Sequence, residues 1–323
     1  MAVEKILATP RSFGKADRSP IALLEEAGYE VVLNPVGRIL TQEEMKLHIA
    51  DAAGIIVGVD PLNAEVLSCA GRLRAISKYG VGTDNIDLAR AQALGIPVST
   101  TVGANADAVA DYAFALMTAC ARRLVEIDGR CRRRDWGKIT ALDLYGKTLG
   151  ILGLGAIGKG VARRARGFGM TVLAYDVYWD EGYAAKNHIR RAGPEEILRV
   201  CDFISIHLPL TGETRGMIGW EQLRAMKPTA VLVNTARGGI VDERALVRAL
   251  REGEIYAAGV DAFSQEPPED PELYGLDNLI MGSHCAASTV GAVEQMGLMA
   301  AQNLLKALSA GLPCRAQKRA GTV

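Results

Sequence analysis

The 323-residue chain lacks the features of several special classes of protein. Its 37 basic and 37 acidic residues leave no net charge, which argues against general binding to nucleic acids or to membrane surfaces. Its six cysteines form no CxxC pair and no regular framework, a pattern typical of reduced thiols in a cytosol and not of a disulfide scaffold or a zinc site. We therefore expect a cytoplasmic protein without a bound metal.

Segments that would enter a membrane are also missing. The N-terminus, MAVEKILATPRS, has no cleavable apolar core and predicts a first strand. The most apolar long stretch, residues 104–121, contains Asp107 and Asp111, so it predicts a buried helix and not a membrane span. What is present, 49% hydrophobic and 23% charged residues over 323 positions, indicates a globular protein of two domains.

Short β-rich runs alternate with helical patterns along the whole chain. Because such alternation builds parallel sheets covered by helices on both faces, we expect an α/β protein. The expected strands are 5–8, 29–33, 54–59, 74–77, 98–100, 148–152, 171–175, 203–207, 230–234, 257–260 and 279–281. Helical patterns between them include 20–27, 85–93, 159–168, 220–226 and 243–251.

A glycine-rich turn lies near the middle of the chain, between a predicted strand and a predicted helix. It comprises Gly153, Gly155, Ala156, Ile157 and Gly158. The first glycine permits the tight turn, the second lets backbone approach a pyrophosphate, and the third allows close packing of helix on strand. Such turns also occur for packing alone, but this context, with Asp176 after the next strand, favours a dinucleotide site.

Asp176 lies 18 residues beyond Gly158. A carboxylate at this place accepts hydrogen bonds from both ribose hydroxyls and repels a 2′-phosphate, so it favours NAD over NADP. The alternative is an aspartate that caps the turn at the strand end.

Three polar residues in the second half suggest the chemistry: Arg237 in NTARGGIVDE, Glu266 in GVDAFSQEP and His284 in GSHCAAST. A histidine suits proton transfer in either direction because its reference pKa is about 6.5. Arginine offers a planar two-pronged donor for a carboxylate, although a structural ion pair at a strand end is the alternative. Glu266 stands in an acidic loop that by itself would be a solvated surface turn.

Together these motifs resemble the D-isomer-specific 2-hydroxyacid dehydrogenase family, over essentially all 323 residues. The resemblance implies two doubly wound parallel-sheet domains. A Rossmann NAD domain, 104–286, would be inserted into a flavodoxin-like split substrate domain, 1–103 and 287–323. Helices of about 104–121 and 289–309 would form the crossings. Within the family, KYGVGTDNIDL and NTARGGIVDE are closest to D-3-phosphoglycerate dehydrogenases and their relatives, here without a regulatory domain.

The resemblance also implies roles for individual residues. His284 would be the acid/base, a buried Glu266 would hold its ring, and Arg237 would bind the substrate carboxylate. Further cofactor contacts would be His207, Pro209, Thr214, Thr235, Ala236 and Asp261, the last with a strand-end cap as its alternative. Further substrate contacts would be Lys78, the amides of Val81 and Gly82, and Asn105; the alternative for this loop is a helix-capping turn with Asp84 or Asn85 as N-cap.

One motif departs from the family pattern. Relatives commonly have Thr-Pro-His, where this chain has Gly282, Ser283 and His284 followed by Cys285.

The expected function is an NAD-dependent oxidoreductase that interconverts a D-2-hydroxy acid and its 2-keto acid, as D-3-phosphoglycerate or a related anionic substrate. Lys78 and Arg11 would meet the second anionic group, whereas Gly58 replaces an arginine of the animal-type phosphoglycerate enzymes and weakens that assignment. The alternatives are a hydroxypyruvate or glyoxylate reductase and an NAD(H)-sensing corepressor-like scaffold. We also expect a homodimer that pairs through the 104–121 helix and the arm of residues 122–145.

Overall fold

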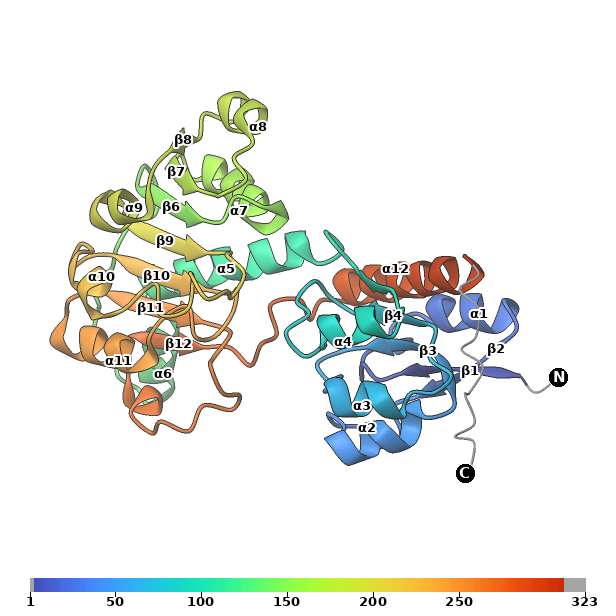
Figure 1. Ribbon diagram of the computed structural model, residues 1–323. Coiled ribbons are helices and arrows are strands. Elements are labelled where there is room, and N and C mark those ends of the chain that lie inside the picture. The colour runs from blue at the N-terminus through green and yellow to red at the C-terminus, as the bar shows by residue number, and fades with distance from the viewer. Residues whose placement is uncertain (1–2, 311–323) are drawn as a thin grey trace. The chain divides into compact units, whose positions relative to one another are not determined.

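The computed structural model describes residues 3–310. The chain divides into two compact units: residues up to Asn105 together with residues from Ser288 onward, and Ala106–Ala287 (Figure 1). The expected crossings, after residues 103 and 286, lie close to these boundaries. The assignment of one unit to the substrate and the other to the cofactor stays a prediction.

The first unit contains a five-stranded parallel sheet in the order β2-β1-β3-β4-β5, a flavodoxin-like order. Its strands are β1 (Glu4–Ala8), β2 (Tyr29–Leu33), β3 (Ala52–Val57), β4 (Ala75–Lys78) and β5 (Val98–Thr100). Its helices are α1 (Ser19–Glu26), α2 (Gln42–Ile49), α3 (Ala64–Cys69), α4 (Leu88–Ala93) and α12 (Val290–Ser309).

Both faces of this sheet are buried. Helices α1 and α12 cover one face of the sheet, and α2 and α3 cover the other (Figure 1). Ile6 and Ile56 pack with the first pair of helices, and Leu7 and Ile55 pack with the second. Because neighbouring residues of a strand point to opposite faces, the central strands must be apolar at every position, as β3 with sequence AAGIIV is.

The second unit contains a seven-stranded parallel sheet in the order β12-β11-β10-β9-β6-β7-β8. The strand order reverses between β6 and β9, as it does at the ligand-binding edge of dinucleotide-binding sheets. The strands are β6 (Thr148–Leu152), β7 (Thr171–Tyr175), β8 (Arg190–Arg191), β9 (Phe203–Ile206), β10 (Val231–Asn234), β11 (Ala257–Val260) and β12 (Leu279–Met281).

Helices bury both faces of the second sheet as well. Apolar residues of α5 (Ala106–Ala121) and α7 (Ala156–Gly167) pack on one face. Those of α9 (Pro194–Val200), α10 (Trp220–Arg224) and α11 (Glu243–Glu252) pack on the other. The remaining helices are α6 (Leu124–Arg132), α8 (Glu181–Lys186) and the 3₁₀ turn η1 (Leu273–Gly275). The predicted fold class, two doubly wound parallel sheets, is confirmed.

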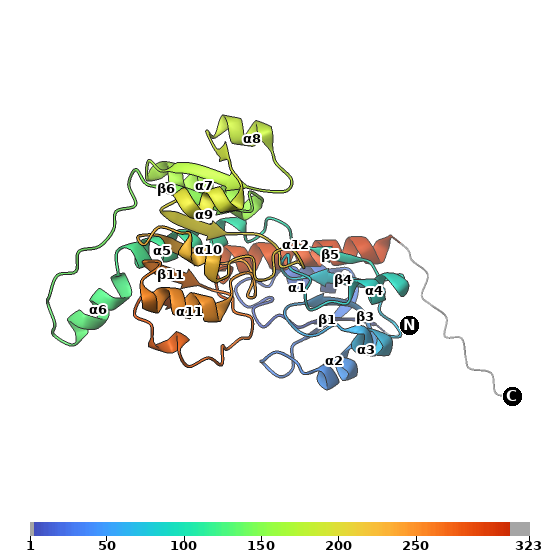
Figure 2. The same ribbon diagram turned by 60° about the vertical axis from the view of Figure 1, so that its left-hand side comes forward.

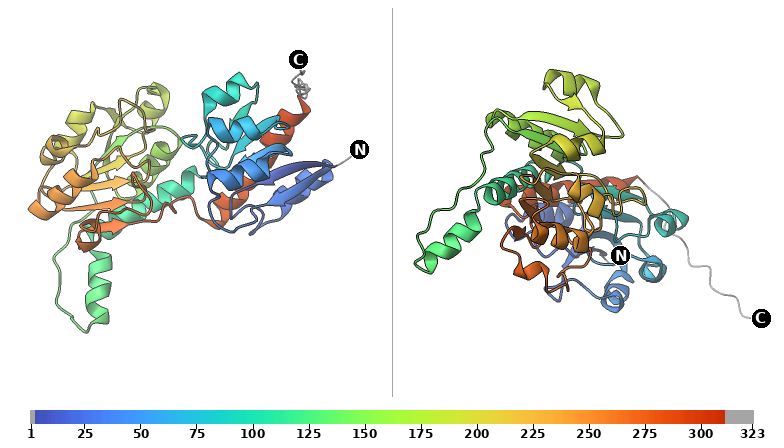
Figure 3. Two further views of the ribbon diagram at one scale, coloured as in Figure 1. Left: turned by 60° about the horizontal axis from the view of Figure 1, so that its bottom comes forward. Right: turned by 90° about the vertical axis from the view of Figure 1, so that its left-hand side faces the viewer.

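An arm formed by α6 and the segment that follows it stands apart from the rest of its unit (Figures 2 and 3). None of the α6 residues is buried. Large apolar side chains of the arm are exposed, and Trp136 and Tyr145 are each 80% exposed. Among the helices within residues 3–310, none combines the length and the apolar character needed to cross a membrane.

Two local expectations were wrong. Helix α4 begins at Leu88 and not at residue 85, because the side chain of Asp87 accepts a hydrogen bond from Arg90 N and forms the N-cap. Neither Asp84 nor Asn85 therefore caps it. Helix α7 begins at Ala156, three residues before the expected start, because the glycine turn leads directly into the helix.

Candidate active site

The glycine turn connects β6 to α7 and depends on the absence of side chains. Gly153 has φ +101°, and a Cβ there would lie 2.7 Å from the carbonyl carbon of His207. A Cβ on Gly158 would lie 2.0 Å from the carbonyl oxygen of Gly153. Gly155, at the N-cap of α7, has open space around it. The turn therefore packs tightly on one side and leaves room for a phosphate group on the other, next to free amides of a 12-residue helix.

Two buried polar atoms at this edge of the sheet have no hydrogen-bond partner within residues 3–310. They are Nδ1 of His207, which follows β9, and Oγ1 of Thr235, which follows β10. Buried polar atoms rarely lack a hydrogen-bond partner. These two unpaired atoms therefore fit a site where a polar ligand binds at the carboxyl ends of the strands. The residues present thus suit a dinucleotide. The expected places of its pyrophosphate, at Gly155, and of its ribose, at Asp176, stay predictions.

His207 is a neutral group in this setting. Burial lowers the pKa of His207 to about 3, and its Nε2 lies 2.8 Å from Oγ of Ser205. It therefore carries no positive charge for a phosphate at neutral pH. Its predicted role as a cofactor contact is limited to hydrogen bonding.

Asp176 follows β7 and holds the glycine turn. Its Oδ2 accepts a hydrogen bond from Leu154 N at 2.7 Å, and its Oδ1 accepts one from Tyr178 N at 2.8 Å. The capping alternative therefore describes its contacts within the chain. Each carboxylate oxygen has a second acceptor position, so binding of a ribose is compatible with these contacts and stays a prediction.

The other predicted cofactor residues lie in loops after the strands of the same sheet. Thr214 donates from its hydroxyl to the carbonyl oxygen of Pro209 at 2.6 Å, which closes the loop after His207. Ala236 donates its amide to Oδ1 of Asn234 at 3.0 Å. Ala156 and Ile157 form the first turn of α7.

The three predicted catalytic residues follow three neighbouring strands: Arg237 after β10, Glu266 after β11 and His284 after β12. The Nδ1 atom of His284 lies 2.9 Å from Oε1 and 3.0 Å from Oε2 of Glu266. The amide of Phe263 donates to Oε1 of Glu266 at 3.1 Å and fixes the carboxylate. The expectation that Glu266 is buried was wrong, because its side chain is 39% exposed and that of His284 is 44% exposed.

Arg237 lies on a turn that contacts the segment leading to Glu266. Asn234 Nδ2 donates to the carbonyl oxygen of Arg237 at 2.9 Å, and Arg237 Nη1 donates to that of Ala236 at 2.7 Å. A Cβ on Gly238 would lie 2.0 Å from the carbonyl carbon of Phe263, so the glycine lets the two backbones touch. The arginine and the His–Glu pair are thereby gathered at one edge of the sheet.

Asp261 ends up beneath the His284 loop. It is 1% exposed, and its carboxylate accepts hydrogen bonds from Cys285 N at 3.0 Å and Ala286 N at 2.9 Å. The hydroxyl of Tyr112, on α5, lies 3.4 Å from Sγ of Cys285. No sequence signal distinguished Tyr112, because a tyrosine in a largely apolar helix is expected to pack in the core.

In the first unit, the predicted substrate residues follow β4 and β5. Lys78 is 6% exposed, and its Nζ donates to Oδ1 of Asn85 at 2.8 Å and to the carbonyl oxygen of Gly58. Within residues 3–310, the amides of Val81 and Gly82 donate to no other residue. Asn105 is half-buried at the end of this stretch.

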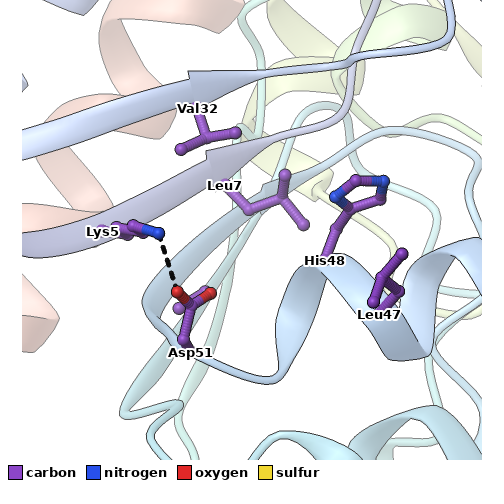
Figure 4. Close-up of a pocket in the computed structure, with 7 residues that line it drawn as sticks. Lys5, Leu7, Val32, Leu47, His48 and Asp51 are labelled. Carbon is purple, nitrogen blue, oxygen red and sulfur yellow. Dashed lines mark hydrogen bonds and ion pairs between the residues drawn. The ribbon is translucent and has the colours of Figure 1, made fainter.

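A hollow of about 260 Å³ lies between the end of α2 and strands β1 and β2 of the first sheet (Figure 4). Lys5 and Asp51 at its wall pair at 2.8 Å, and Leu7, Val32 and His48 complete much of the lining. Since its charges are already paired and the carboxyl ends of the strands lie elsewhere, we assign it no ligand.

Comparisons with known proteins agree with this geometry. The family model for the NAD binding domain of D-isomer specific 2-hydroxyacid dehydrogenases matches residues 114–286. A glyoxylate reductase of Korarchaeum cryptofilum is 46% identical over 253 residues, 76% of either chain. The crystal structure of a Thermus thermophilus protein has a TM-score of 0.87 at 38% identity, covering 95% of this chain and 97% of that one. A D-3-phosphoglycerate dehydrogenase of Methanocaldococcus jannaschii is 40% identical over 292 residues, 89% of this chain and 55% of the other.

This chain belongs to the D-isomer specific 2-hydroxyacid dehydrogenase family. It is an NAD-dependent oxidoreductase that acts on 2-hydroxy acids, and the predicted family, activity and cofactor are confirmed. The roles of individual residues in this dehydrogenase stay predictions.

Proposed function

We propose that this dehydrogenase reduces a small 2-keto acid of the glyoxylate or hydroxypyruvate class to the corresponding 2-hydroxy acid, the D-isomer where the product is chiral, with His284 as the acid. The observation that carries the proposal is the contact of His284 Nδ1 with Glu266, 2.9 Å and 3.0 Å from its two oxygens. With Nδ1 held by the carboxylate, Nε2 is the ring atom that faces a substrate. A histidine with one nitrogen oriented in this way is suited to proton transfer.

When bound at the glycine turn, NADH would supply the hydride for the carbonyl carbon of the keto acid. As the carbonyl oxygen gains the electron pair of the π bond, His284 Nε2 donates its proton to that oxygen. The Glu266 carboxylate binds Nδ1 and keeps the ring in one orientation throughout the transfer. Solvent then returns a proton to His284 Nε2, which restores the acid for the next turnover.

Arg237 is the proposed ligand of the substrate carboxylate. The backbone of Arg237 accepts a hydrogen bond from Asn234, and the next residue, Gly238, lies against the backbone of Phe263. The guanidinium is held by the bond from Nη1 to the carbonyl oxygen of Ala236. A fixed planar donor of this kind binds a carboxylate through two parallel hydrogen bonds, which orients the carbonyl group for reduction. The proposed contribution of the first unit is the pair of amides at Val81 and Gly82.

Lys78 supports a small substrate over a phosphorylated one. Its ammonium group is buried and donates to Asn85 and to the carbonyl of Gly58, so it serves the interior of the first unit. We propose that these bonds, and not a second anionic group of the substrate, are the main contacts of Lys78. The glyoxylate reductase of Korarchaeum cryptofilum is 46% identical over 253 residues, and the phosphoglycerate dehydrogenase is 40% identical over 292 residues.

The test is a panel of 2-keto acids assayed by the loss of NADH absorbance. We expect a higher kcat/KM with glyoxylate and hydroxypyruvate than with 3-phosphohydroxypyruvate. A clear preference for the phosphorylated acid restores the D-3-phosphoglycerate assignment. Binding of NADH without turnover of any 2-keto acid contradicts the proposal and favours an NAD(H)-sensing scaffold.

The arm of α6 supports the proposed homodimer. Leu124, Val125 and Trp136 expose apolar surface that the unit itself does not cover, and symmetric pairing is the commonest way to cover such a surface. Light scattering at micromolar concentration is expected to give twice the mass of 34.4 kDa, and a variant with Leu124→Asp and Val125→Asp is expected to be monomeric. A monomeric wild-type protein would contradict the pairing.

We also propose a cytoplasmic location, because the cysteines within residues 3–310 are free thiols. Burial raises the pKa of Cys120 and of Cys201 to about 12, so these two stay protonated and unreactive.

A further inference from the structure

The loop that carries the proposed carboxylate-binding amides begins at an unusual glycine. Gly80, two residues after the end of β4, has φ +128°, a conformation that residues with a Cβ rarely adopt. Because a glycine is restricted so little by its own sterics, its conformation depends on the groups that bind it. Those groups therefore decide where the next two amides, of Val81 and Gly82, point.

Thr101 binds both peptide groups of Gly80. Its hydroxyl accepts a hydrogen bond from Gly80 N at 2.9 Å and donates one to the carbonyl oxygen of Gly80 at 3.2 Å. Its backbone amide donates to the same carbonyl oxygen at 2.9 Å. One residue thus makes three hydrogen bonds to one glycine, and both lone pairs of the carbonyl oxygen are in use.

The bonds to the carbonyl oxygen fix the direction of the Val81 amide. The carbonyl group of Gly80 and the N–H of Val81 belong to one trans peptide unit, which is planar, so they point in opposite directions. Holding the oxygen on one side therefore holds the N–H on the other side. Within residues 3–310, the amides of Val81 and Gly82 donate to no other residue, which leaves them available to a ligand.

Thr101 is itself held in place by its surroundings. It follows β5, which pairs with β4 so that Thr100 lies opposite Lys78, and it is 0% exposed. Its carbonyl oxygen accepts a hydrogen bond from Ala104 N at 3.2 Å, in the turn that leads to Asn105. Thr101 therefore contacts both stretches of the first unit for which substrate contacts are predicted.

We propose that Thr101 is a positioning residue that directs the Val81 amide toward the carboxylate of the 2-keto acid. The position needs a hydroxyl, because one side-chain group must both accept from Gly80 N and donate to the carbonyl oxygen of Gly80. A valine of similar shape would fill the space and leave both bonds unmade. The proposal rests on the proposed function, in which the amides of Val81 and Gly82 bind that carboxylate.

The principal test compares Thr101→Val with Thr101→Ser. In Thr101→Val we expect the KM for glyoxylate to rise about tenfold, the effect of weakening one hydrogen bond to a charged group. The kcat should change less than about threefold, since the carboxylate contact exists before and during the reaction. Thr101→Ser keeps the hydroxyl and should hold KM within about threefold of the wild-type value. An unchanged KM in Thr101→Val overturns the proposal, and so does an equal rise in both variants.

Ser99→Ala is the matched control for the loss of a hydroxyl at this edge of the sheet. Ser99 lies on β5, and its hydroxyl donates to the carbonyl oxygen of Ile76 on β4 at 3.3 Å, away from the amide loop. We expect its KM to be unchanged. In all three variants the Kd of NADH should stay within about twofold, as for most substitutions away from a ligand. A rise in the Kd of NADH as large as the rise in KM contradicts the proposal, because it shows general damage.

Hydrogen exchange tests the bonds of Thr101 without any reaction. In the wild-type protein, the Gly80 amide should exchange slowly and the amides of Val81 and Gly82 fast, measured by mass spectrometry with fragments that resolve single residues. Thr101→Val should exchange the Gly80 amide at least about tenfold faster, and Thr101→Ser should not. A rapidly exchanging Gly80 amide in the wild-type protein contradicts the proposal even where Thr101→Val does not fold.

Oxamate separates the positioning role from the proposed function. It carries the carboxylate of a 2-keto acid but an amide in place of the reducible carbonyl group, so its binding to the NADH complex reports the carboxylate contact alone. The Kd of oxamate, measured by fluorescence titration, should rise about tenfold in Thr101→Val and stay within about threefold in Thr101→Ser. Weaker oxamate binding in Thr101→Val without turnover of any 2-keto acid supports the positioning role and rejects only the proposed function. An unchanged Kd of oxamate in Thr101→Val contradicts the positioning role.

Discussion

In the five-stranded sheet, polar residues beyond the strands bind one another, whereas in the seven-stranded sheet several of them face outward or lack a partner. Beyond β1 and β3, the hydroxyl of Thr9 donates to buried Asp60, whose other oxygen accepts from Leu40 N at 2.9 Å. Lys78 is bound by Asn85 and Gly58. Beyond β9 and β10, by contrast, His207 Nδ1 and Thr235 Oγ1 have no partner within residues 3–310.

This difference indicates that the polar residues at the two sheets have different roles, one structural and one in ligand binding. The polar residues beyond β1, β3 and β4 form hydrogen bonds among themselves, although Ser77 Oγ within β4 and Arg90 Nε of α4 also lack a partner within residues 3–310. The partly unsatisfied edge of the second unit, with the exposed His284–Glu266 pair, is suited to exchange bonds with a cofactor and a substrate. The predictions that follow test this contrast, in order of decreasing effect.

The largest effect is expected at the glycine turn. In Gly158→Ala, the new Cβ would lie 2.0 Å from a backbone oxygen that cannot move aside easily. We expect the Kd of NADH to rise at least about tenfold, together with a loss of about 1–3 kcal/mol in stability from overpacking. Fluorescence titration and thermal unfolding measure both. Gly167→Ala, at a position of the same helix with open space around it, is the control and should change neither.

The next effect concerns the choice of cofactor. Replacing Asp176 by Ser removes the carboxylate that would repel a 2′-phosphate, so we expect the ratio of kcat/KM for NADH over NADPH to fall about tenfold or more, the size of one lost charged contact. A loss of kcat/KM with both cofactors is also expected, because the substitution removes the hydrogen bonds from the amides of Leu154 and Tyr178. A wild-type preference for NADPH is inconsistent with this role of Asp176.

A smaller effect is expected in the pH dependence of stability. The pKa of His207 is about 3 in the folded chain, below its value of 6.5 in the unfolded chain, so the unfolded chain binds more protons between these values. Stability therefore falls as the pH drops below about 6.5, by about 1.4 kcal/mol per pH unit for one proton. His207→Gln should remove this contribution. Equal slopes for the two proteins between pH 6 and pH 4, measured by urea unfolding, would show that His207 is not kept neutral by burial.

The smallest effect is expected at Arg11, an exposed residue of the first unit. If the substrate is a small monoacid, Arg11→Ala should change kcat/KM for glyoxylate by less than about twofold, as for most surface substitutions. A tenfold loss with 3-phosphohydroxypyruvate alone would show that the first unit also offers a charge to a second anionic group.

The strands of both sheets were largely predictable from the sequence, because buried parallel strands are short apolar runs between glycines and helical patterns. The bounds of β2, β5, β6, β7 and β11 agree with the expected ones. β8 was not predicted, since it consists of Arg190 and Arg191, both exposed, and contains no apolar run. Its position follows from pairing with β7, which is a tertiary effect.

The candidate site was predictable only in part. The pairing of His284 with Glu266 came from the family resemblance, because nothing local distinguishes Glu266 from its acidic neighbours Glu269 and Asp270. The burial of Lys78 and the contact of Asp261 with the loop at Cys285 depend on which strands are neighbours. Side-chain bonds across such distances in sequence leave no periodic pattern that could have indicated them.

The most direct test of the account measures kcat and the Kd of NADH for His284→Ala beside the wild-type dehydrogenase, with the best substrate of the keto-acid panel. We expect kcat to fall about 10²- to 10⁴-fold, the range for a positioned acid or base, and the Kd of NADH to stay within about twofold. A large fall in kcat with an unchanged Kd of NADH would locate the proton transfer at His284, at the exposed edge of the second unit. Full kcat in His284→Ala would contradict the central claim.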